Sequence, residues 1–165
     1  MGTVVALTNS KDGLGKTTLA VHLAGWSQER IGRTAFVDTD VRGHGSSWLR
    51  QASPKTEIFR LLTPDEILDR VPELAVQFDV LVIDGPPRLP EVTRAILLLA
   101  HLALVPCGGS TSDARAVHEA IHCIRQARKI RSGPPQALLV PNKVRTRCRP
   151  PRELSDTLKS LSIPV

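Results

Sequence analysis

The sequence predicts an α/β fold, namely a doubly wound and mainly parallel sheet with helices on both faces. Two observations lead to this prediction. Short apolar runs alternate along the chain with amphipathic segments of helical length. These runs are apolar on both faces, as parallel strands are when helices cover them on both sides. Because ligands of such sheets bind at the carboxyl ends of the strands, the residues that end each run are candidates for function.

Five runs are expected to be strands, at residues 3–7, 34–38, 79–84, 102–106 and 136–141. Three segments are expected to be helices, at residues 17–31, 90–100 and 112–130. The first helix repeats four residues at helical spacing: Leu19, Leu23, Trp26 and Arg30. The last has an apolar stripe of Ala114, Val117, Ile121 and Ile124, with basic side chains off it.

The chain has 165 residues, which suits one domain over residues 1–165. It ends with LKSLSIPV, a helix followed by what reads as the start of a strand, so we expect a C-terminal portion to be missing. No signal peptide is visible, and the most apolar window, around 95–106, is too short to span a bilayer. We therefore predict a cytoplasmic protein without a membrane partner. The net charge of +6 favours a polyanionic partner.

Residues 8–18, TNSKDGLGKTT, join the first strand to the first helix and contain most of a phosphate-binding loop. The usual motif is G-x-x-x-x-G-K-[ST], in which glycines let backbone N–H groups surround phosphate oxygens. Gly15, Lys16 and Thr17 supply its second half, whereas Ser10 stands at the first glycine and an extra lysine, Lys11, follows. Lys16 is expected to contact the β- and γ-phosphates and Thr17 to bind Mg²⁺, so ATP and Mg²⁺ are the predicted cofactors.

Aspartates end two other predicted strands. Asp38 and Asp40 belong to FVDTD, and Asp84 belongs to DVLVIDGPP. A carboxylate at the tip of a strand beside the P-loop strand suits the coordination shell of Mg²⁺, usually through water. One such aspartate could merely cap a turn, but three are hard to explain in that way. The predicted metal site is Thr17, Asp38 and Asp84.

These motifs resemble the deviant Walker A ATPases of the ParA/MinD superfamily. The resemblance rests on K-x-G-x-G-K-T-T, on V-D-T-D followed by a glycine and S-S-W, and on D-V-L-V-I-D-G-P-P, and it covers essentially the whole chain. LALVPC followed by STSDARAV is similar to the small ParA branch, which lacks an N-terminal helix-turn-helix domain. The resemblance implies a P-loop NTPase fold and an ATPase that hydrolyses ATP to ADP and phosphate.

The resemblance also implies partners and a cellular role. Members of this branch dimerise on ATP, bind DNA without sequence specificity and position a plasmid, a chromosome or a protein assembly. The expected partners are a second copy of the chain, DNA, and a ParB-like or other cargo adaptor that stimulates hydrolysis. The expected location is therefore the nucleoid.

Site roles follow from the resemblance position by position. Lys11 is the signature lysine that reaches the partner's phosphates, Thr18 an α-phosphate contact and Asn142 an adenine contact. Asp40 orients the attacking water, which makes Lys11, Lys16 and Asp40 the expected catalytic residues. The expected nucleotide-binding residues are Lys11, Asp12, Gly13, Leu14, Gly15, Lys16, Thr17, Thr18 and Asn142.

Two positions depart from the family pattern. Asp12 replaces a glycine and adds a negative charge beside the phosphates, and DTDVRG replaces the common D-x-D-P-Q-G. Val41 and Arg42 therefore stand in the water-positioning loop. We expect weaker phosphate binding or an outward-facing Asp12, and slow or differently regulated hydrolysis.

The segment 142–152, NKVRTRCRPPR, is basic and contains no acidic residue. Such a run is most often a solvated loop, but the net charge and the family's DNA binding favour a DNA contact. The predicted DNA-binding residues are Lys143, Arg145, Arg147 and Arg149.

Other functions remain open. The sequence DTDVR also fits the D-x-D-x-R motif of bacterial tyrosine kinases, although the chain contains no tyrosine. A MinD-like membrane-cycling ATPase requires a C-terminal amphipathic helix that this sequence does not contain. A metabolic ligase of the dethiobiotin-synthetase kind gives Lys11 no role. A catalytically inactive relative is compatible with Asp12 and Arg42.

Overall fold

The computed structural model describes residues 1–143. It contains a six-stranded sheet of order β3-β2-β4-β1-β5-β6 in which every neighbouring pair is parallel. The strands are β1 (Thr3–Leu7), β2 (Thr34–Asp38), β3 (Glu57–Arg60), β4 (Val80–Asp84), β5 (Leu102–Cys107) and β6 (Gln136–Pro141). The helices are α1 (Lys16–Arg30), α2 (His44–Ala52), α3 (Pro64–Gln77), α4 (Pro90–Leu99) and α5 (Thr111–Arg131).

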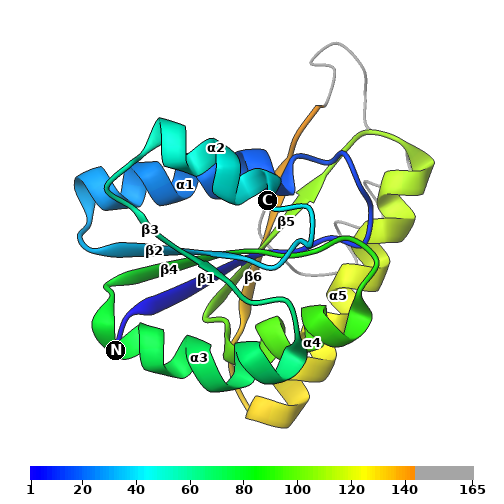
Figure 1. Ribbon diagram of the computed structural model, residues 1–165. Coiled ribbons are helices and arrows are strands. Elements are labelled where there is room, and N and C mark those ends of the chain that lie inside the picture. Colours follow the sequence, from blue (N-terminus) through cyan, green and yellow to red (C-terminus); the bar gives the residue numbers. More distant parts are fainter. Residues whose placement is uncertain (144–165) are drawn as a thin grey trace.

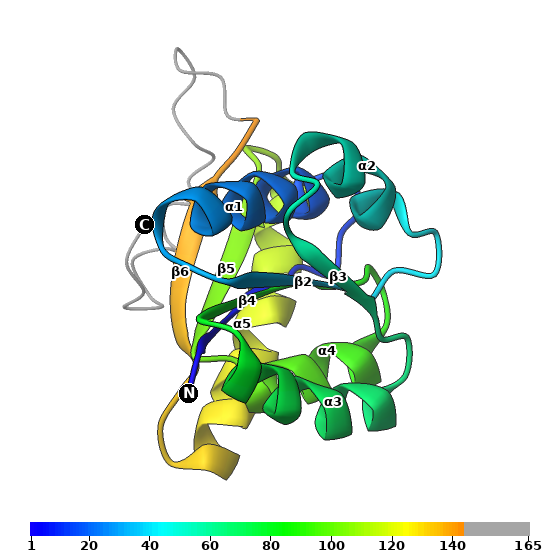
Figure 2. The same ribbon diagram turned by 60° about the vertical axis from the view of Figure 1, so that its left-hand side comes forward.

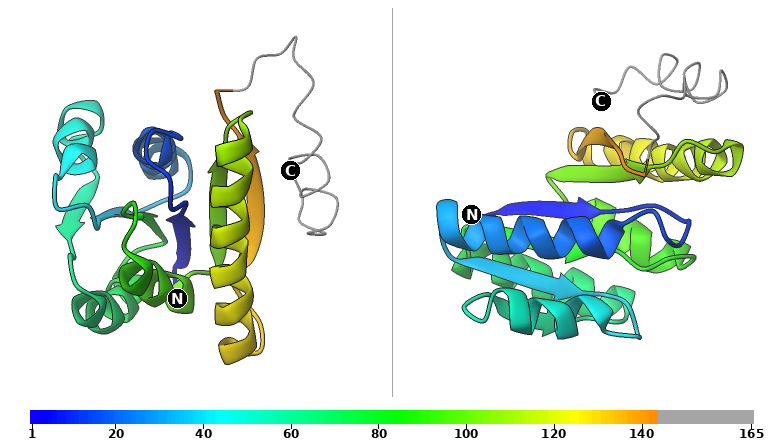
Figure 3. Two further views of the ribbon diagram at one scale, coloured as in Figure 1. Left: turned by 90° about the vertical axis from the view of Figure 1, so that its right-hand side faces the viewer. Right: turned by 90° about the horizontal axis from the view of Figure 1, so that it is seen from above.

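Helices cover both faces of the sheet (Figure 1). Helices α1 and α2 lie on one face, and α3 and α4 lie on the other (Figure 2). Helix α5 runs beside β5 and β6, which the end-on view of Figure 3 shows clearly. Strand β2 illustrates how the core forms, since Phe36 packs with α1 whereas Ala35 and Val37 pack with α3 and α4. The predicted doubly wound α/β fold is confirmed.

The five predicted strands are present, with bounds that differ from the prediction by at most one residue. No helix or strand is predicted from the sequence between residues 39 and 78, where α2, β3 and α3 lie. Strand β3 is short and half-exposed at the sheet edge, so it lacks a fully apolar run. Helix α3 holds Pro72 in its interior, but Thr63 and Glu66 form a capping box at its start. That capping signal, T-P-D-E, is readable in the sequence.

The buried face of α1 differs from the expected stripe. Trp26 is 55 % exposed, and the fully buried apolar side chains are Ala20, Val21 and Ala24, with Leu19 and Leu23 partly buried against the same core cluster. Small side chains at the fully buried positions let the helix axis lie close to the sheet. The stripe predicted for α5 is buried as expected. None of the helices within residues 1–143 combines the length and the apolarity needed to cross a membrane.

Candidate nucleotide-binding site

The sheet register brings the predicted motifs to one edge. Asp84 at the end of β4 pairs with Leu7 of β1 on one side and with Asp38 of β2 on the other. A cavity of about 410 Å³ opens at this edge. Its walls come from the P-loop, from Asp40 and Arg42 after β2, from the loop after β4 and from Lys143 after β6.

The P-loop has the conformation that phosphate binding requires. Gly13 and Gly15 have φ of 76° and 90°, in the left-handed region that favours glycine. Gly15 precedes α1 and provides no side-chain cap, so the N–H groups at the start of α1 are open to an anion. Lys16 is buried, and its Nζ donates a hydrogen bond to the carbonyl oxygen of Lys11 at 2.9 Å. Burial lowers the pKa of Lys16, an effect that the charges of Asp12, Asp84 and Asp40 oppose.

The end of β6 closes over the P-loop. The Asn142 Nδ2 donates to the carbonyl oxygen of Leu14 at 2.9 Å. A Cβ added to Gly15 would clash with the same amide nitrogen, so Asn142 packs directly against the glycine. The Lys143 Nζ donates to the carbonyl oxygen of Gly13 at 2.7 Å. Asn142 thus fixes the loop, and its adenine contact remains a prediction. Lys143 lines the cavity, where its ammonium satisfies a P-loop carbonyl, and its DNA contact remains a prediction.

Lys11 points away from the cavity that Lys16 serves. Its Nζ donates to Asp113 Oδ1 at 2.5 Å and to Ser112 Oγ at 2.7 Å, both in the first turn of α5. The Asp113 side chain is 8 % exposed. Burial raises the pKa of Asp113, but hydrogen bonds from Lys11 and Ser110 outweigh that effect and lower it overall. The Lys11 ammonium is therefore engaged by the first turn of α5 and not by the phosphate cavity.

Asp84 is a buried carboxylate without a hydrogen-bond partner in the described part of the chain. Burial raises its pKa to about 7, and nearby Asp38 and Asp40 act in the same direction. The Thr17 hydroxyl and Lys16 lower the pKa of Asp84 in part, although Thr17 is not at hydrogen-bonding geometry. An orphaned carboxylate facing the P-loop threonine fits the water shell of a bound Mg²⁺, so the residues present suit this cofactor.

Asp38 is already engaged. Its Oδ2 accepts from the backbone N and the Oγ of Ser46, at 2.8 and 2.5 Å, and its Oδ1 accepts from Asp40 N at 3.1 Å. These bonds hold the loop after β2 against the start of α2. Among residues 1–143, no cluster of three or more His, Cys, Asp or Glu side chains forms a metal site. Asp38 is thus hydrogen-bonded within the protein, and its role as a metal ligand remains a prediction.

The loop after β2 carries the strongest ion pair of the cavity. The Arg42 guanidinium contacts both oxygens of Asp40, with Nη2 at 2.7 Å from Oδ2 and Nε at 3.1 Å from each oxygen. This pairing is the main cause that lowers the pKa of Asp40. Arg42 Nη2 also lies 3.4 Å from Asp12 Oδ1. Asp12 thus faces the cavity, contrary to the outward option.

The structure brings the P-loop residues, Asp40 and Asp84 to one site, with Asn142 against its rim. It also adds Arg42 and Lys143 to the walls of the cavity. Both residues are named in the sequence analysis, but the sequence does not show that their side chains point into the cavity. The predicted DNA-binding residues Arg145, Arg147 and Arg149 lie outside the described residues.

Comparison with known proteins agrees with this site. The family model of the CobQ/CobB/MinD/ParA nucleotide binding domain matches residues 5–165. The chain belongs to this family. The domain is thus a nucleotide-binding domain of the ParA/MinD type, which confirms the resemblance seen in the sequence motifs.

Two curated relatives carry names of positioning proteins. The chain is 26 % identical over 147 residues to the chromosome partitioning protein ParA of Myxococcus xanthus, covering 64 % of this chain and 52 % of the relative. It is 32 % identical over 124 residues to the maintenance of carboxysome distribution protein A of Gloeobacter kilaueensis, covering 72 % and 55 %. The chain therefore spans about half the length of the curated relatives it matches.

Solved structures share the fold. Cobyrinic acid a,c-diamide synthase from Mycobacterium smegmatis, with bound ADP and magnesium, gives a TM-score of 0.76 at 22 % identity, over 98 % of this chain and 81 % of that one. The pNOB8 ParA bound to nonspecific DNA gives 0.69 at 17 % identity, over 98 % and 74 %. The bound ADP and magnesium agree with the predicted cofactors, a nucleotide with Mg²⁺.

Proposed function

We propose that this chain is a ParA-like ATPase that dimerises on ATP, binds DNA without sequence specificity and positions a cargo. The proposal rests on one observation: two lysines of the same loop point in different directions. Lys16 lies in the cavity of its own subunit, whereas Lys11 is directed to the start of α5 and away from that cavity. A P-loop that serves only its own nucleotide has no need of the second lysine.

The residues of one subunit have distinct roles in ATP binding. Lys16, the N–H groups at the start of α1 and the glycine turns at Gly13 and Gly15 hold the phosphates. Thr17 and Asp84 would hold Mg²⁺ with its water shell, and the ion would supply neutralisation of phosphate charge. Asp40 orients the attacking water at the open side of the cavity.

Dimerisation is where Lys11 contributes. An ATP-bound subunit presents phosphate charge at the cavity mouth, and the Lys11 ammonium of a second subunit is attracted to it. To reach across, Lys11 must exchange Asp113 and Ser112 for phosphate oxygens, which carry more negative charge than one carboxylate. ATP therefore favours the dimer, and hydrolysis followed by phosphate release removes that preference.

DNA binding follows from charge and valency. The exposed side of α5 carries Arg115, Arg125 and Lys129, and the net charge of the chain is +6. Each neutralised phosphate adds roughly 0.9 to the slope of log K against log salt, so a single subunit with few contacts binds weakly at physiological salt. A dimer doubles these contacts, and ATP thereby controls DNA binding.

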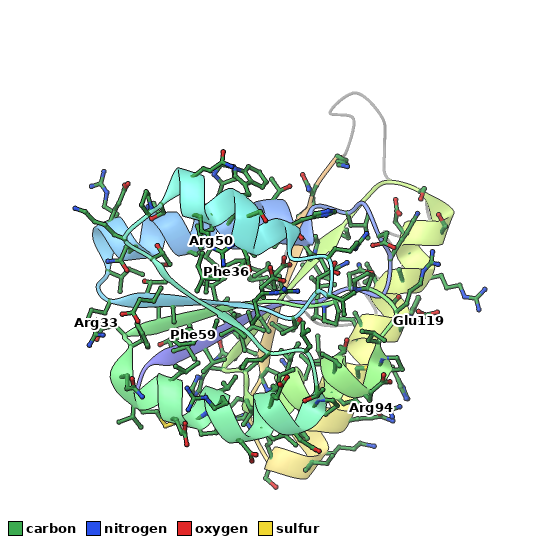
Figure 4. The ribbon with its side chains drawn as sticks, viewed as in Figure 1. Arg33, Phe36, Arg50, Phe59, Arg94 and Glu119 are labelled. Atoms are coloured by element: carbon green, nitrogen blue, oxygen red, sulfur yellow. The ribbon has the colours of Figure 1, made fainter. Side chains whose placement is uncertain are left out.

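The test is a salt titration of binding to duplex DNA, with ATP, with ADP and without nucleotide. We expect ATP-dependent binding with a steep salt slope and equal affinity for unrelated sequences. Glu substitution at Arg115 and Arg125 should flatten the slope, whereas Glu at Arg94, an exposed arginine on α4 (Figure 4), should alter it less. Equal affinity in all nucleotide states would refute the proposal, and retained binding after the Arg115 and Arg125 reversals would assign the DNA surface to other residues.

The same experiment separates other functions of this fold. A metabolic ligase would turn over ATP with a small carboxylate substrate and would show no ATP-dependent DNA binding. A membrane-cycling ATPase would show ATP-dependent binding to anionic vesicles instead. The tyrosine-kinase alternative would show phosphate transfer to a tyrosine-containing peptide.

A further inference from the structure

An ionic bridge crosses the mouth of the nucleotide cavity and joins two loops. Arg42 makes a bidentate ion pair with Asp40 and also approaches Asp12, a P-loop residue 30 positions earlier in the sequence. All three side chains line the cavity. The bridge therefore lies where the phosphates of a bound nucleotide would approach.

The two departures from the family pattern, Asp12 and Arg42, contact one another in this bridge. A carboxylate at position 12 alone would repel the phosphates that the loop binds. Arg42 supplies the opposite charge at the same place, so the second departure compensates for the first. The charge of Asp12 is therefore balanced only because Arg42 is also present.

The two contacts of Arg42 differ in strength. Asp40 is 13 % exposed and engages the guanidinium at 2.7 Å with a second contact at 3.1 Å, which is a strong charge-assisted geometry. Asp12 is 48 % exposed and 3.4 Å away, a pairing of the kind that contributes little net stability. Arg60, at the end of β3, donates to the carbonyl oxygens of Asp40 and Val41 and clamps this loop from behind. The Asp40–Arg42 unit is thus held in place, whereas the Asp12 contact is easily exchanged.

We propose that Arg42 is a contact for the terminal phosphate of a bound nucleoside triphosphate, with Asp40 as its positioning residue and Asp12 as the partner that the phosphate displaces. This inference rests on the proposed ATP binding. A guanidinium has five donors in a planar fork, so it can keep Asp40 while it takes a phosphate oxygen. A diphosphate lacks the group that displaces Asp12, so Arg42 favours ATP over ADP. The subunit then senses its nucleotide in cis, before any second subunit arrives.

The test measures the dissociation constants of Mg²⁺ complexes of ADP and of a non-hydrolysable ATP analogue. Arg42→Gln should weaken binding of the ATP analogue about ten-fold and that of ADP less than about two-fold, the scale of one charge-assisted contact. Arg42→Lys keeps the charge but loses the fork, and should restore only part of the preference. Asp12→Asn should keep the preference, because Asp40 still holds Arg42.

The matched control is Arg50→Gln, an exposed arginine of α2 that is labelled in Figure 4 and does not line the cavity. It should leave both constants unchanged, and circular dichroism verifies that each variant is folded. An equal loss of both nucleotides in Arg42→Gln, or no loss of either, would overturn the role of Arg42 and leave the proposed ATPase intact. If the wild-type chain bound neither nucleotide, both proposals would fall.

Discussion

The Lys11 ammonium lies 2.5 Å from the Asp113 carboxylate, so an ion pair between residues 102 positions apart joins the P-loop to the first turn of α5. Asp113 also accepts from the Ser110 backbone N–H in the capping box of α5. One carboxylate therefore stabilises the start of a helix and holds the lysine that the family resemblance assigns to the partner's phosphates.

The pairing predicts how stability depends on pH. Because the folded-state pKa of Asp113 is lowered, its contribution to the free energy of unfolding is present above about pH 4 and is lost as pH falls through the folded-state value. Asp113→Asn should reduce the free energy of unfolding by about 1–2 kcal/mol at pH 7. The deficit relative to wild type should shrink toward pH 3. Thermal unfolding at several pH values measures it, with the exposed Asp69→Asn of α3 as control. A deficit that does not vary with pH would contradict the ionic role of Asp113.

The contribution of Asp84 to the free energy of unfolding depends on pH in the opposite direction. Burial raises its folded-state pKa to about 7, so the stability tied to its neutral form is complete below about pH 4 and is lost as pH rises through 7. In nucleotide-free protein, Asp84→Asn should therefore raise the free energy of unfolding, by an amount that increases between pH 5 and pH 8. With ATP present, the same variant should lose the extra thermal stability that Mg²⁺ confers on wild type. A variant that keeps a full Mg²⁺ response would exclude Asp84 from the metal site.

Substitution of Asp40 is expected to affect ATP hydrolysis much more than ATP binding. Asp40→Ala retains Lys16 and the P-loop, so it should still bind ATP and dimerise, although loss of the Arg42 partner should weaken ATP binding by up to about ten-fold, as in Arg42→Gln. It should hydrolyse ATP at least roughly 100-fold more slowly, the typical scale for loss of a group that positions or activates the attacking water. Single-turnover phosphate release measures this rate. Hydrolysis at the wild-type rate would mean that another group, with Arg42 the nearest candidate, orients the water.

The sequence was sufficient for the parts of the fold with continuous patterns. Strands that are apolar on both faces were located almost to the residue, because burial on both sides leaves no polar position. The edge strand β3 and the proline-containing α3 lack that continuity and were not assigned. The buried face of α1 is predicted only in part: Leu19 and Leu23 pack against the core, but the fully buried positions hold small side chains and Trp26 is exposed.

Some residues of the candidate site could also be predicted from the sequence, and others could not. Lys16, Thr17 and Asp84 follow from a motif and from strand ends, which the parallel register brings together. The directions of Arg42 and Lys143 depend on loops that meet only in three dimensions. Asp38 reads in the sequence as a metal ligand, but its carboxylate is taken up by Ser46 at the start of α2. Asp12 and Arg42 looked like two independent departures, and only the structure shows them as one pair.

In the proposed dimer, Lys11 acts on the nucleotide of the second subunit. Light scattering of wild type, Lys11→Ala and Lys16→Ala, each with ATP and with ADP, tests it most directly. We expect wild type to form a dimer with ATP only, and Lys16→Ala to lose nucleotide binding because the phosphates lose their main point charge. Lys11→Ala should bind ATP with affinity close to wild type yet remain a monomer. A Lys11→Ala protein that forms the ATP-dependent dimer as wild type does would contradict the account.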